Sequence, residues 1–437
     1  MKTTADTLAT RLETLLGRQA VQEDPGGLEA HSVDGMVPSV RVAPQDAAQI
    51  SEVLKICTED HAAVVPWGGG TSIGLGNRPS RVDVVLSLER FTGLIEHDDA
   101  NLTATAQAGM RVAGLQQILA GRHQFLAIDP PQAAEATIGG VVAANTNGPR
   151  RMHYGGVRDQ VIGMKCVLAT GEQVKSGGKV VKNVAGYDMC KLFTGSLGTL
   201  GVITEVTFRM APVPERSASV LASGTIAQAL KMVEQIEASA LLPSAVTLVN
   251  ARAAVQLTAE SGIRKHESDY LVLVWVEGFS EAVERHLNDL RTMAKAACMS
   301  AEALEDSQHQ TLWKSICDFT SIVSGPLYRL TLPLGAIGGA ISTIDGWSPT
   351  PQIVAHTGAG TLWVASDVGD VAGWFARLSA LATSNRGHAM VAAAPPHVKE
   401  VVDVWGPPPP GMSIMAEIKR QFDPAGILNP GRFVARL

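Results

Sequence analysis

A glycine-rich loop near residue 70 places the strongest constraint on how this chain folds. Residues 64–77 begin with a β-branched run, turn at Pro66 and then hold five glycines. Glycine lets the backbone take positive φ and come close to a bulky ligand, and successive N–H groups in such a turn form a concave anion site. Thr71 and Ser72 add two hydroxyl donors. We interpret the loop as one that wraps a pyrophosphate; the alternative is a flexible surface loop.

The loop differs from two familiar phosphate-binding sequences. No lysine follows the glycines, which excludes the P-loop of ATP-binding proteins. The G-x-G-x-x-G spacing of the Rossmann turn is also missing, here and elsewhere in the chain.

A second segment favours the ligand-binding interpretation. Residues 137–148 are almost all small, and we expect that they cannot pack a core through their own bulk. Small residues let a large, flat group lie against the backbone. The sequence therefore predicts that residues 66–77 and 137–148 come together around a single dinucleotide.

Hydrophobic periodicity predicts a small α/β unit followed by an antiparallel region in the first half of the chain. The expected strands are residues 40–42, 63–66, 82–88, 102–108, 161–168, 173–175 and 202–210, and the expected helices are 46–59, 112–119 and a short one after 188.

From residue 216 the sequence pattern changes to expected strands that alternate with expected helices. This pattern predicts a second α+β domain with a mostly antiparallel sheet. The expected strands are 219–222, 245–249, 271–276, 328–332, 352–355 and 362–365, and the expected helices are 226–238, 281–297, 334–344 and 370–384. A closing helix over 412–422 places Ile414, Met415, Ile418 and Phe422 on one face.

Composition excludes several classes of function. The 437 residues include 36 basic and 42 acidic ones, which is not the basic excess of a nucleic-acid-binding protein. Five scattered cysteines without a C-x-x-C pair argue against an iron–sulfur or zinc site of the chain's own and favour a reducing compartment. Residues 1–17 read as an amphipathic helix, and no apolar run reaches transmembrane length.

Five stretches together resemble the FAD-linked oxidase family of the p-cresol methylhydroxylase and vanillyl-alcohol oxidase type. They are residues 66–74, 137–148, 154–159, 195–203 and 422–432. Within that family, KNVAGYD at 182–188, PRR at 149–151 and FDPAGILNPGR at 422–432 resemble the FAD-binding subunit of bacterial glycolate oxidase. The match is dense in the first half and the tail, and loose in the middle.

The resemblance implies an α+β architecture with a two-subdomain FAD-binding domain of the p-cresol methylhydroxylase (PCMH) type, an α+β cap with an antiparallel sheet, and a tail that returns to the flavin. The expected divisions are 1–36 (helix and lead-in), 37–214 (FAD-binding domain), 215–405 (cap or substrate domain) and 406–437 (C-terminal helix and tail).

Carried over by motif, the resemblance assigns cofactor-binding residues in four groups. The group that would hold the pyrophosphate comprises Pro66, Gly68, Gly69, Gly70, Thr71, Ser72 and Gly74. The group that would line the ribityl, ribose and isoalloxazine path comprises Pro130, Thr137, Gly140, Ala144, Gly148, Tyr154 and Asp159. The adenine or the flavin edge would lie by Gly198, Gly201, Val202 and Ile203, and Asn429 would approach the isoalloxazine. In relatives with covalent flavin a histidine often follows the glycines, and Thr71 stands there, so we expect non-covalent FAD.

Oxidation of a 2-hydroxy acid needs a group that binds the carboxylate and a group that takes the hydroxyl proton. Arg329 is the candidate for the carboxylate, because a guanidinium fork makes two parallel bonds to it; the alternative is an exposed strand arginine. His356 lies in H-T-G-A-G-T, which resembles the H-x-G-D-G-N segment of D-2-hydroxy-acid dehydrogenases, where the histidine helps bind a metal. Ala359 and Thr361 replace the acid and the asparagine and no second ligand histidine is evident, so His356 is a base, a ligand or a structural histidine, and we expect no metal.

The expected function is that of a flavin subunit of a glycolate oxidase-type complex that oxidises glycolate or D-lactate. Its implied partners are a paralogous flavin subunit and an iron–sulfur subunit that feeds quinone, with a location in the cytoplasm or peripheral to the inner membrane through a partner. Two other interpretations stay open: a non-catalytic assembly or electron-relay subunit, and a stand-alone FAD oxidase.

Overall fold

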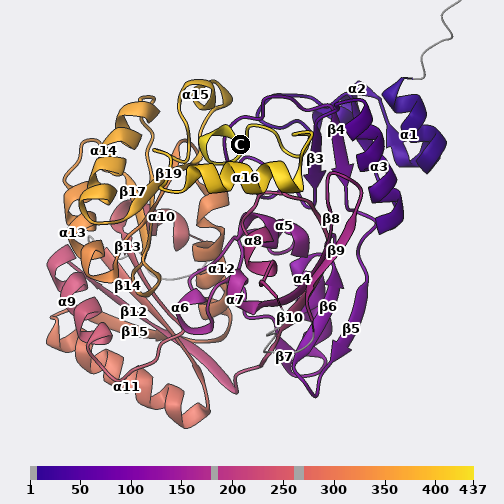
Figure 1. Ribbon diagram of the computed structural model, residues 1–437. Coiled ribbons are helices and arrows are strands. Elements are labelled where there is room, and N and C mark those ends of the chain that lie inside the picture. Colours follow the sequence, from indigo (N-terminus) through magenta and orange to yellow (C-terminus); the bar gives the residue numbers. More distant parts are fainter. Residues whose placement is uncertain (1–6, 179–185, 260–269) are drawn as a thin grey trace, which may run out of the picture.

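The computed structural model describes residues 7–178, 186–259 and 270–437. Two lobes lie side by side, with the N-terminal half in one and most of the C-terminal half in the other (Figure 1). The KNVAGYD motif predicted to lead into a short helix lies in part outside the described residues, which resume at Gly186.

The first lobe holds two small sheets. One has the order β1-β2-β4-β3, with β2, β4 and β3 parallel, and the other has the antiparallel order β5-β6-β10-β8-β9. The strands are β1 (Val21–Gln22), β2 (Val40–Val42), β3 (Val64–Trp67), β4 (Val84–Ser87), β5 (Leu94–Asp98), β6 (Thr103–Gln107), β8 (Val161–Val167), β9 (Gln173–Gly177) and β10 (Val202–Arg209), with a separate pair β7 (Gln124–Phe125) and β11 (Ala211–Pro212).

Helices of this lobe pack on both sheets into one continuous core. In α3 (Ala47–Glu59), Asp46 caps the first turn, and Ile50, Val53, Leu54 and Cys57 are buried, as their spacing predicts. The other helices are α1 (Leu8–Leu16), α2 (Pro25–Glu29), α4 (Val112–Ala120), α5 (Ile138–Ala144), α6 (Arg151–Tyr154), α7 (Val157–Gln160) and α8 (Cys190–Phe193), with the 3₁₀ turn η1 (Arg18–Ala20).

One expectation about residues 137–148 is wrong. The segment forms α5, and Ile138, Val141 and Val142 are buried in the core of the lobe. Its small residues bring the helix close to the neighbouring chain: a Cβ on Gly139 would lie 2.7 Å from the Cβ of Ala108. Close approach lets the few branched side chains reach the core, so the segment contributes packing after all.

The second lobe is built on one eight-stranded sheet with the order β15-β12-β14-β13-β17-β18-β16-β19, in which every neighbouring pair is antiparallel. The predicted antiparallel sheet is thereby confirmed. The strands are β12 (Arg216–Gly224), β13 (Ala245–Asn250), β14 (Tyr270–Gly278), β15 (Ser300–Leu304), β16 (Leu327–Thr331), β17 (Gln352–His356), β18 (Thr361–Ala365) and β19 (His388–Ala393).

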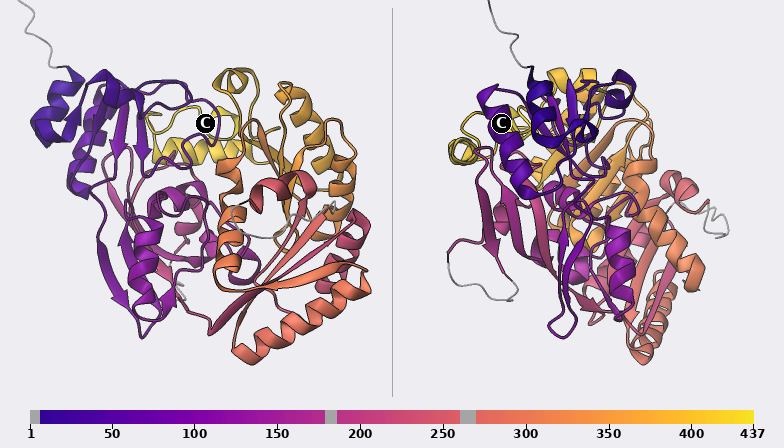
Figure 2. Two further views of the ribbon diagram at one scale, coloured as in Figure 1. Left: turned by 180° about the vertical axis from the view of Figure 1, so that it is seen from behind. Right: turned by 90° about the vertical axis from the view of Figure 1, so that its right-hand side faces the viewer.

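Helices cover both faces of this sheet (Figure 2). One face packs against α9 (Ile226–Glu237), α11 (Ser280–Ala296), α13 (Leu334–Asp345) and α14 (Val371–Ser384). The opposite face packs against α10 (Ala251–Leu257) and α12 (Asp306–Ile322), and the turn η2 (Thr357–Ala359) joins β17 to β18. The sequence did not lead us to expect α12, and this helix contributes to the cavity described below.

The C-terminal segment crosses back to the first lobe. It comprises α15 (Pro396–Val401), α16 (Met412–Phe422) and the turn η3 (Val434–Arg436). After α16, Ile427 and Leu428 enter the core of the first lobe, and Leu428 forms a parallel bridge with Val64 of β3. The face predicted for α16 is only partly correct: Ile418 and Phe422 pack on that core, but Ile414, in the first turn, is 65% exposed.

Candidate functional site

The glycine loop, α5 and the C-terminal tail enclose a small cleft, here called the loop cleft. Its volume is about 80 Å³. It is lined by residues 66–73 of the loop, Gly140, Ala143 and Ala144 of α5, and Leu197, Asn429 and Arg432. Two segments predicted to meet around one ligand therefore share a cleft.

Glycines allow the loop and α5 to meet. A Cβ on Gly68 would lie 2.2 Å from Thr137 Oγ1, and one on Gly69 would lie 2.0 Å from the carbonyl oxygen of Glu135. Thr137 is buried as the N-cap of α5. The sequence suggested that glycines are needed here so that a ligand can come close. The structure adds a second reason, since the loop and α5 could not pack together if these two residues had side chains.

Polar groups in the loop cleft suit an anion with hydroxyl or amide groups. Within the described ranges, the backbone N–H groups of residues 69–72 donate to no protein acceptor. Asn429 donates from Nδ2 to the carbonyl oxygen of Leu197 at 2.6 Å, while its buried Oδ1 has no partner among the described residues. Buried polar groups are normally hydrogen-bonded, so the Oδ1 of Asn429 suits a ligand that donates to it. The N–H groups of the loop suit the phosphates of a dinucleotide.

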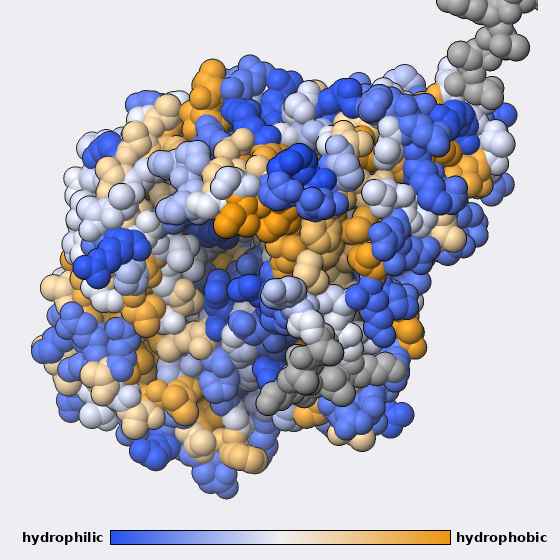
Figure 3. Space-filling model, in the orientation of Figure 1, coloured by the Kyte–Doolittle hydropathy of each residue, from blue (hydrophilic) through white to orange (hydrophobic). Residues whose placement is uncertain are grey.

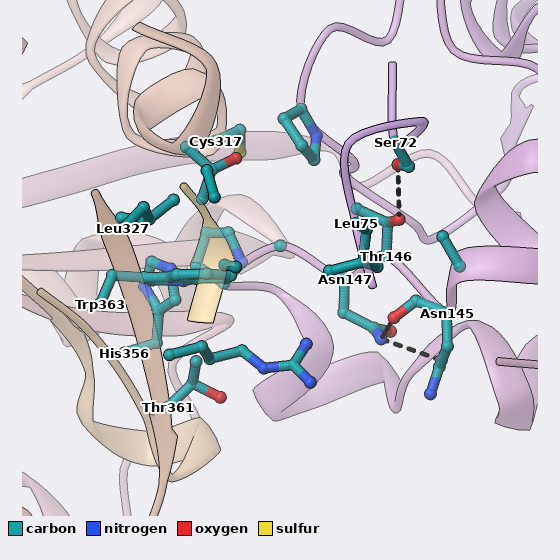
Figure 4. Close-up of a pocket in the computed structure, with 18 of the residues that line it drawn as sticks. Ser72, Leu75, Asn145, Thr146, Asn147, Cys317, Leu327, His356, Thr361 and Trp363 are labelled. Carbon is teal, nitrogen blue, oxygen red and sulfur yellow. Dashed lines mark hydrogen bonds between the residues drawn. The ribbon is translucent and has the colours of Figure 1, made fainter. Parts of the chain in front are cut away.

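The loop cleft continues into a larger cavity between the lobes, here called the interlobe cavity, of about 280 Å³. Thr71, Ser72 and Ala144 line both spaces. Figure 3 shows the surface hollowed between the two lobes. In Figure 4, Asn145, Thr146 and Asn147 face Trp363, His356 and Thr361 of the large sheet across the cavity.

Strand register gathers the side chains on the sheet side of the interlobe cavity. Arg329 of β16 pairs with Trp363 of β18, and Thr361 of β18 pairs with both Thr331 and His356. The guanidinium carbon of Arg329 lies 5.9 Å from the centre of the Trp363 ring. Burial, and secondarily Arg151, lowers the pKa of Arg329 to about 10, so the group stays cationic at neutral pH. Of the residues that the structure describes, no aspartate or glutamate lines this cavity, which makes it suitable for an anion.

His356 lies at the edge of the same cavity and is 6% exposed. Its Nδ1 is 3.0 Å from Thr247 Oγ1, a contact that fixes the ring. Burial, and secondarily Arg151, lowers the pKa of His356 to about 4, so its imidazole is neutral at neutral pH. In the part of the chain that the structure describes, no group of three or more His, Cys, Asp or Glu side chains could hold a metal.

A buried polar cluster lies next to the interlobe cavity. Asp129 accepts hydrogen bonds from the backbone N–H groups of Gly148 and Arg150, at 3.1 and 2.9 Å. The Arg150 guanidinium lies 3.7 Å from Glu277 of β14 and over the rings of Phe125 and Trp275. Burial raises the pKa of Asp129 to about 6. This cluster holds the 148–150 loop and joins the lobes.

Most of the predicted cofactor residues lie together. Those that line the loop cleft or the interlobe cavity are Pro66, Gly68, Gly69, Gly70, Thr71, Ser72, Gly74, Gly140, Ala144, Gly148 and Asn429. Gly198 lies next to this group, since a Cβ on it would be 3.2 Å from Asn429 Nδ2.

Other predicted cofactor residues line neither space. Tyr154 packs in the buried cluster, where burial and then Glu277 raise the pKa of its hydroxyl. Asp159 accepts from the N–H of Gly156 at 2.8 Å. Val202 and Ile203 are buried in β10, Gly201 packs against Phe193, and Pro130 is buried beside Pro131, which does line the cavity.

Several residues of the site were missed from the sequence. Ile316, Cys317 and Thr320 of α12, together with Arg151, Trp363 and Arg432, line the two spaces. The spacing of Leu312, Ile316 and Phe319, all buried, signals α12 in retrospect. No local pattern distinguishes Arg432 from any other tail residue.

Comparison with known proteins places this geometry in a family. Residues 38–177 match the family described as FAD binding domain, and residues 213–322 and 407–433 match FAD linked oxidases, C-terminal domain. A D-lactate dehydrogenase of Archaeoglobus fulgidus is 30% identical over 435 residues, which cover 91% of this chain and 92% of that protein. Glycolate oxidase subunit GlcE of Escherichia coli is 28% identical over 88% of this chain and 97% of its own length. Glycolate oxidase subunit GlcD of Bacillus subtilis is 28% identical over 92% of this chain and 90% of its own length.

Solved structures share the fold at low sequence identity. p-Cresol methylhydroxylase with substrate bound has a TM-score of 0.72 at 16% identity, over 97% of this chain and 96% of that one. A 4-ethylphenol oxidase from Gulosibacter chungangensis has a TM-score of 0.74 at 15% identity, over the same shares. The architecture is therefore that of the PCMH type, and the chain belongs to the family of FAD-linked oxidases, with FAD as its cofactor.

Proposed function

We propose that this chain oxidises a small 2-hydroxy acid, glycolate or D-lactate, to the 2-oxo acid. The observation that supports this most is the cationic Arg329 side chain in a cavity whose described lining residues include no carboxylate. The names of several relatives point to the same substrates: glycolate oxidase subunits, D-lactate dehydrogenases and a D-2-hydroxyglutarate dehydrogenase.

Two residues have distinct proposed roles at the substrate. Arg329 binds the carboxylate with its guanidinium fork, and Trp363 beside it limits the orientations of that fork. His356 is neutral and takes the proton of the substrate hydroxyl. FAD, when bound, supplies the acceptor for the hydride from the hydroxyl-bearing carbon.

The cofactor is proposed to be held without a covalent bond. Thr71 stands where relatives with covalent flavin have a histidine, and it lines both the loop cleft and the interlobe cavity. The residues at 66–74, Gly140, Ala144, Gly148 and Asn429 would hold the FAD. Acid is expected to release free flavin from a yellow protein.

We place the chain in a complex of the glycolate oxidase type. The names of two relatives include the word subunit, and the described residues offer no metal cluster through which electrons could leave. The proposed partners are a paralogous flavin subunit and an iron–sulfur subunit that passes electrons to quinone, in the cytoplasm or at the inner membrane. Among the described residues, no helix combines the length and apolar character that a membrane crossing needs.

One observation favours a second role within the same complex. The pKa of His356 near 4 makes it a weak base, and the described residues contain no metal site that would activate a hydroxyl. The chain would then hold its flavin as an assembly or electron-relay subunit, and a paralogous subunit would oxidise the substrate.

Anaerobic flavin bleaching tests the proposal and separates the two roles. Bleaching of the isolated chain by glycolate or D-lactate, and its loss in Arg329→Met, is expected if the chain itself is catalytic. Arg329→Lys should recover part of the rate, and Arg291→Met on the exposed side of α11 should match the wild type. Bleaching only after the paralogous subunit is added supports the assembly role, and no bleaching in either case contradicts the proposed substrate class.

A further inference from the structure

Two buried cations hold the carbonyl oxygens at the end of the glycine loop. Arg432 donates from Nη2 to the carbonyl oxygens of Ile73 and Leu75, the second at 2.5 Å. Lys399 donates from Nζ to the carbonyl oxygen of Gly74. Both residues are almost fully buried, Arg432 at 3% and Lys399 at 2% exposed.

Among the described residues, only one of these two cations has an ion-pair partner. Asp34 Oδ1 lies 2.8 Å from Lys399 Nζ. Within the described ranges no carboxylate lies within ion-pair distance of Arg432, and its Nε is buried without a partner. Burial lowers the pKa of Arg432 to about 10, which leaves it protonated at neutral pH. Asp34, Lys399 and Arg432 therefore carry a net positive charge next to the loop.

An excess buried charge is costly unless a counter-charge lies nearby. Arg432 lines the loop cleft, as do residues 69–72 with their free N–H groups. Lys399 also polarises the loop through hydrogen bonds in series, because the N–H of Leu75 donates to Ser72 and the N–H of Ile73 donates to Gly70. The free N–H of Thr71, at the end of this series, therefore attracts an anion more strongly. Both effects act on whatever negative group enters the cleft.

We infer that the FAD pyrophosphate is the counter-ion of the Asp34–Lys399–Arg432 group, and that Arg432, from the C-terminal tail, positions the glycine loop and supplies charge for cofactor binding. None of these three residues was assigned to the cofactor by its motif. The inference concerns binding of the pyrophosphate and does not depend on which substrate the chain oxidises.

Opposite substitutions distinguish a charge effect from a loss of structure. Arg432→Met removes one positive charge and is expected to weaken FAD binding about tenfold to a hundredfold. Arg432→Lys keeps the charge but not the fork, and should recover part of the affinity. Asp34→Asn removes the only carboxylate of the group, so it should tighten FAD binding even though it lowers the stability of the apoprotein. Arg420→Met, on the exposed side of α16, is the control.

The measurements are FAD titration of the apoprotein by fluorescence and competition by inorganic pyrophosphate. We expect pyrophosphate to compete less well in Arg432→Met and better in Asp34→Asn than in the wild type. A merely structural role predicts weaker binding in both variants, and that outcome would overturn the inference. If Arg432→Met does not fold, the direction of the change in Asp34→Asn decides alone.

Discussion

Gly70 occupies a backbone conformation that few other residues adopt. Its φ is +75°, and a Cβ there would lie 3.0 Å from Cζ2 of the Trp67 ring. The neighbouring Gly68 and Gly69 have no positive φ, and they are required instead by contact with Thr137 and Glu135. Three adjacent glycines thus serve the same cleft for different physical reasons.

Gly70→Val is expected to lose FAD. A β-branched residue in the left-handed region costs at least about 1–2 kcal/mol, and its side chain would displace the loop from Trp67 and from the pyrophosphate. Flavin absorbance of the purified variant is the measurement. Gly70→Asn, which tolerates positive φ, should retain more flavin than the valine variant. Full flavin content in Gly70→Val would contradict this role of the loop.

Individual residues were predictable from sequence only where a motif marked them. Gly68, Gly69, Gly70 and Asn429 were, and they line the loop cleft. Arg432 was not assigned, because its partners Ile73 and Leu75 lie 359 and 357 positions away in the sequence. Tyr154 shows the converse, since a motif position placed it on the cofactor path and the fold uses it to pack against Arg150.

Whole elements were predicted where hydrophobic spacing was regular. The spacing in α3 predicted its buried face, and the apolar runs predicted six of the eight strands of the large sheet, whereas β15 and β19 were not expected. Helix α5 was not predicted, because its residues are small and its packing depends on close approach to the neighbouring chain rather than on bulky side chains. Helix α12 went unpredicted although it has four large buried apolar side chains, Leu312, Trp313, Ile316 and Phe319.

The junction of α16 with the tail depends on one buried carboxylate. Asp423 accepts from the N–H groups of Ile427 and Leu428, at 3.0 and 2.8 Å, and its Oδ2 lies 2.5 Å from Lys419 Nζ. Lys419 in turn donates to the carbonyl oxygens of Thr199 and Leu428. These contacts direct the chain from α16 toward Asn429 in the loop cleft.

Asp423→Ala should destabilise the protein by about 3–5 kcal/mol, because it leaves Lys419 unpaired in a buried position. It should also release FAD, since the tail residues that line the cleft lose their anchor. Urea unfolding and flavin content measure the two effects. Glu417→Ala, which breaks the exposed pair with Arg420, should cost less than about 1 kcal/mol. Equal losses in the two variants would show that the junction does not depend on Asp423.

At the scale of the whole molecule, the two lobes have separate hydrophobic cores. They meet around the interlobe cavity through polar contacts and through Met152, which packs against the core of the second lobe. Residues up to Met210, with Ile427 and Leu428, form one core, and residues 218–404 form the others, apart from a small cluster at Val33, Val65, Val82 and Val85. Periodicity predicts each core, but it contains no information about how two cores face each other. The cavity was therefore predictable only through family resemblance.

Arg150 is one of the polar links between the two lobes, and its removal should weaken their coupling. The guanidinium carbon lies 4.6 Å from the centre of the Trp275 ring, and Glu277 and Asp129 flank the group. Arg150→Met would leave both carboxylates buried without their cation, at a cost of about 3–5 kcal/mol. Since that cost falls on the contact between lobes, calorimetry of the apoprotein should show two unfolding transitions in the variant where the wild type shows one.

FAD binds between the lobes in the proposed site, so saturating FAD should bring the two transitions closer together. Arg122→Met, on an exposed pair with Asp99, should leave a single transition. A single, uniformly lowered transition in Arg150→Met would mean that the lobes unfold as one unit without this link.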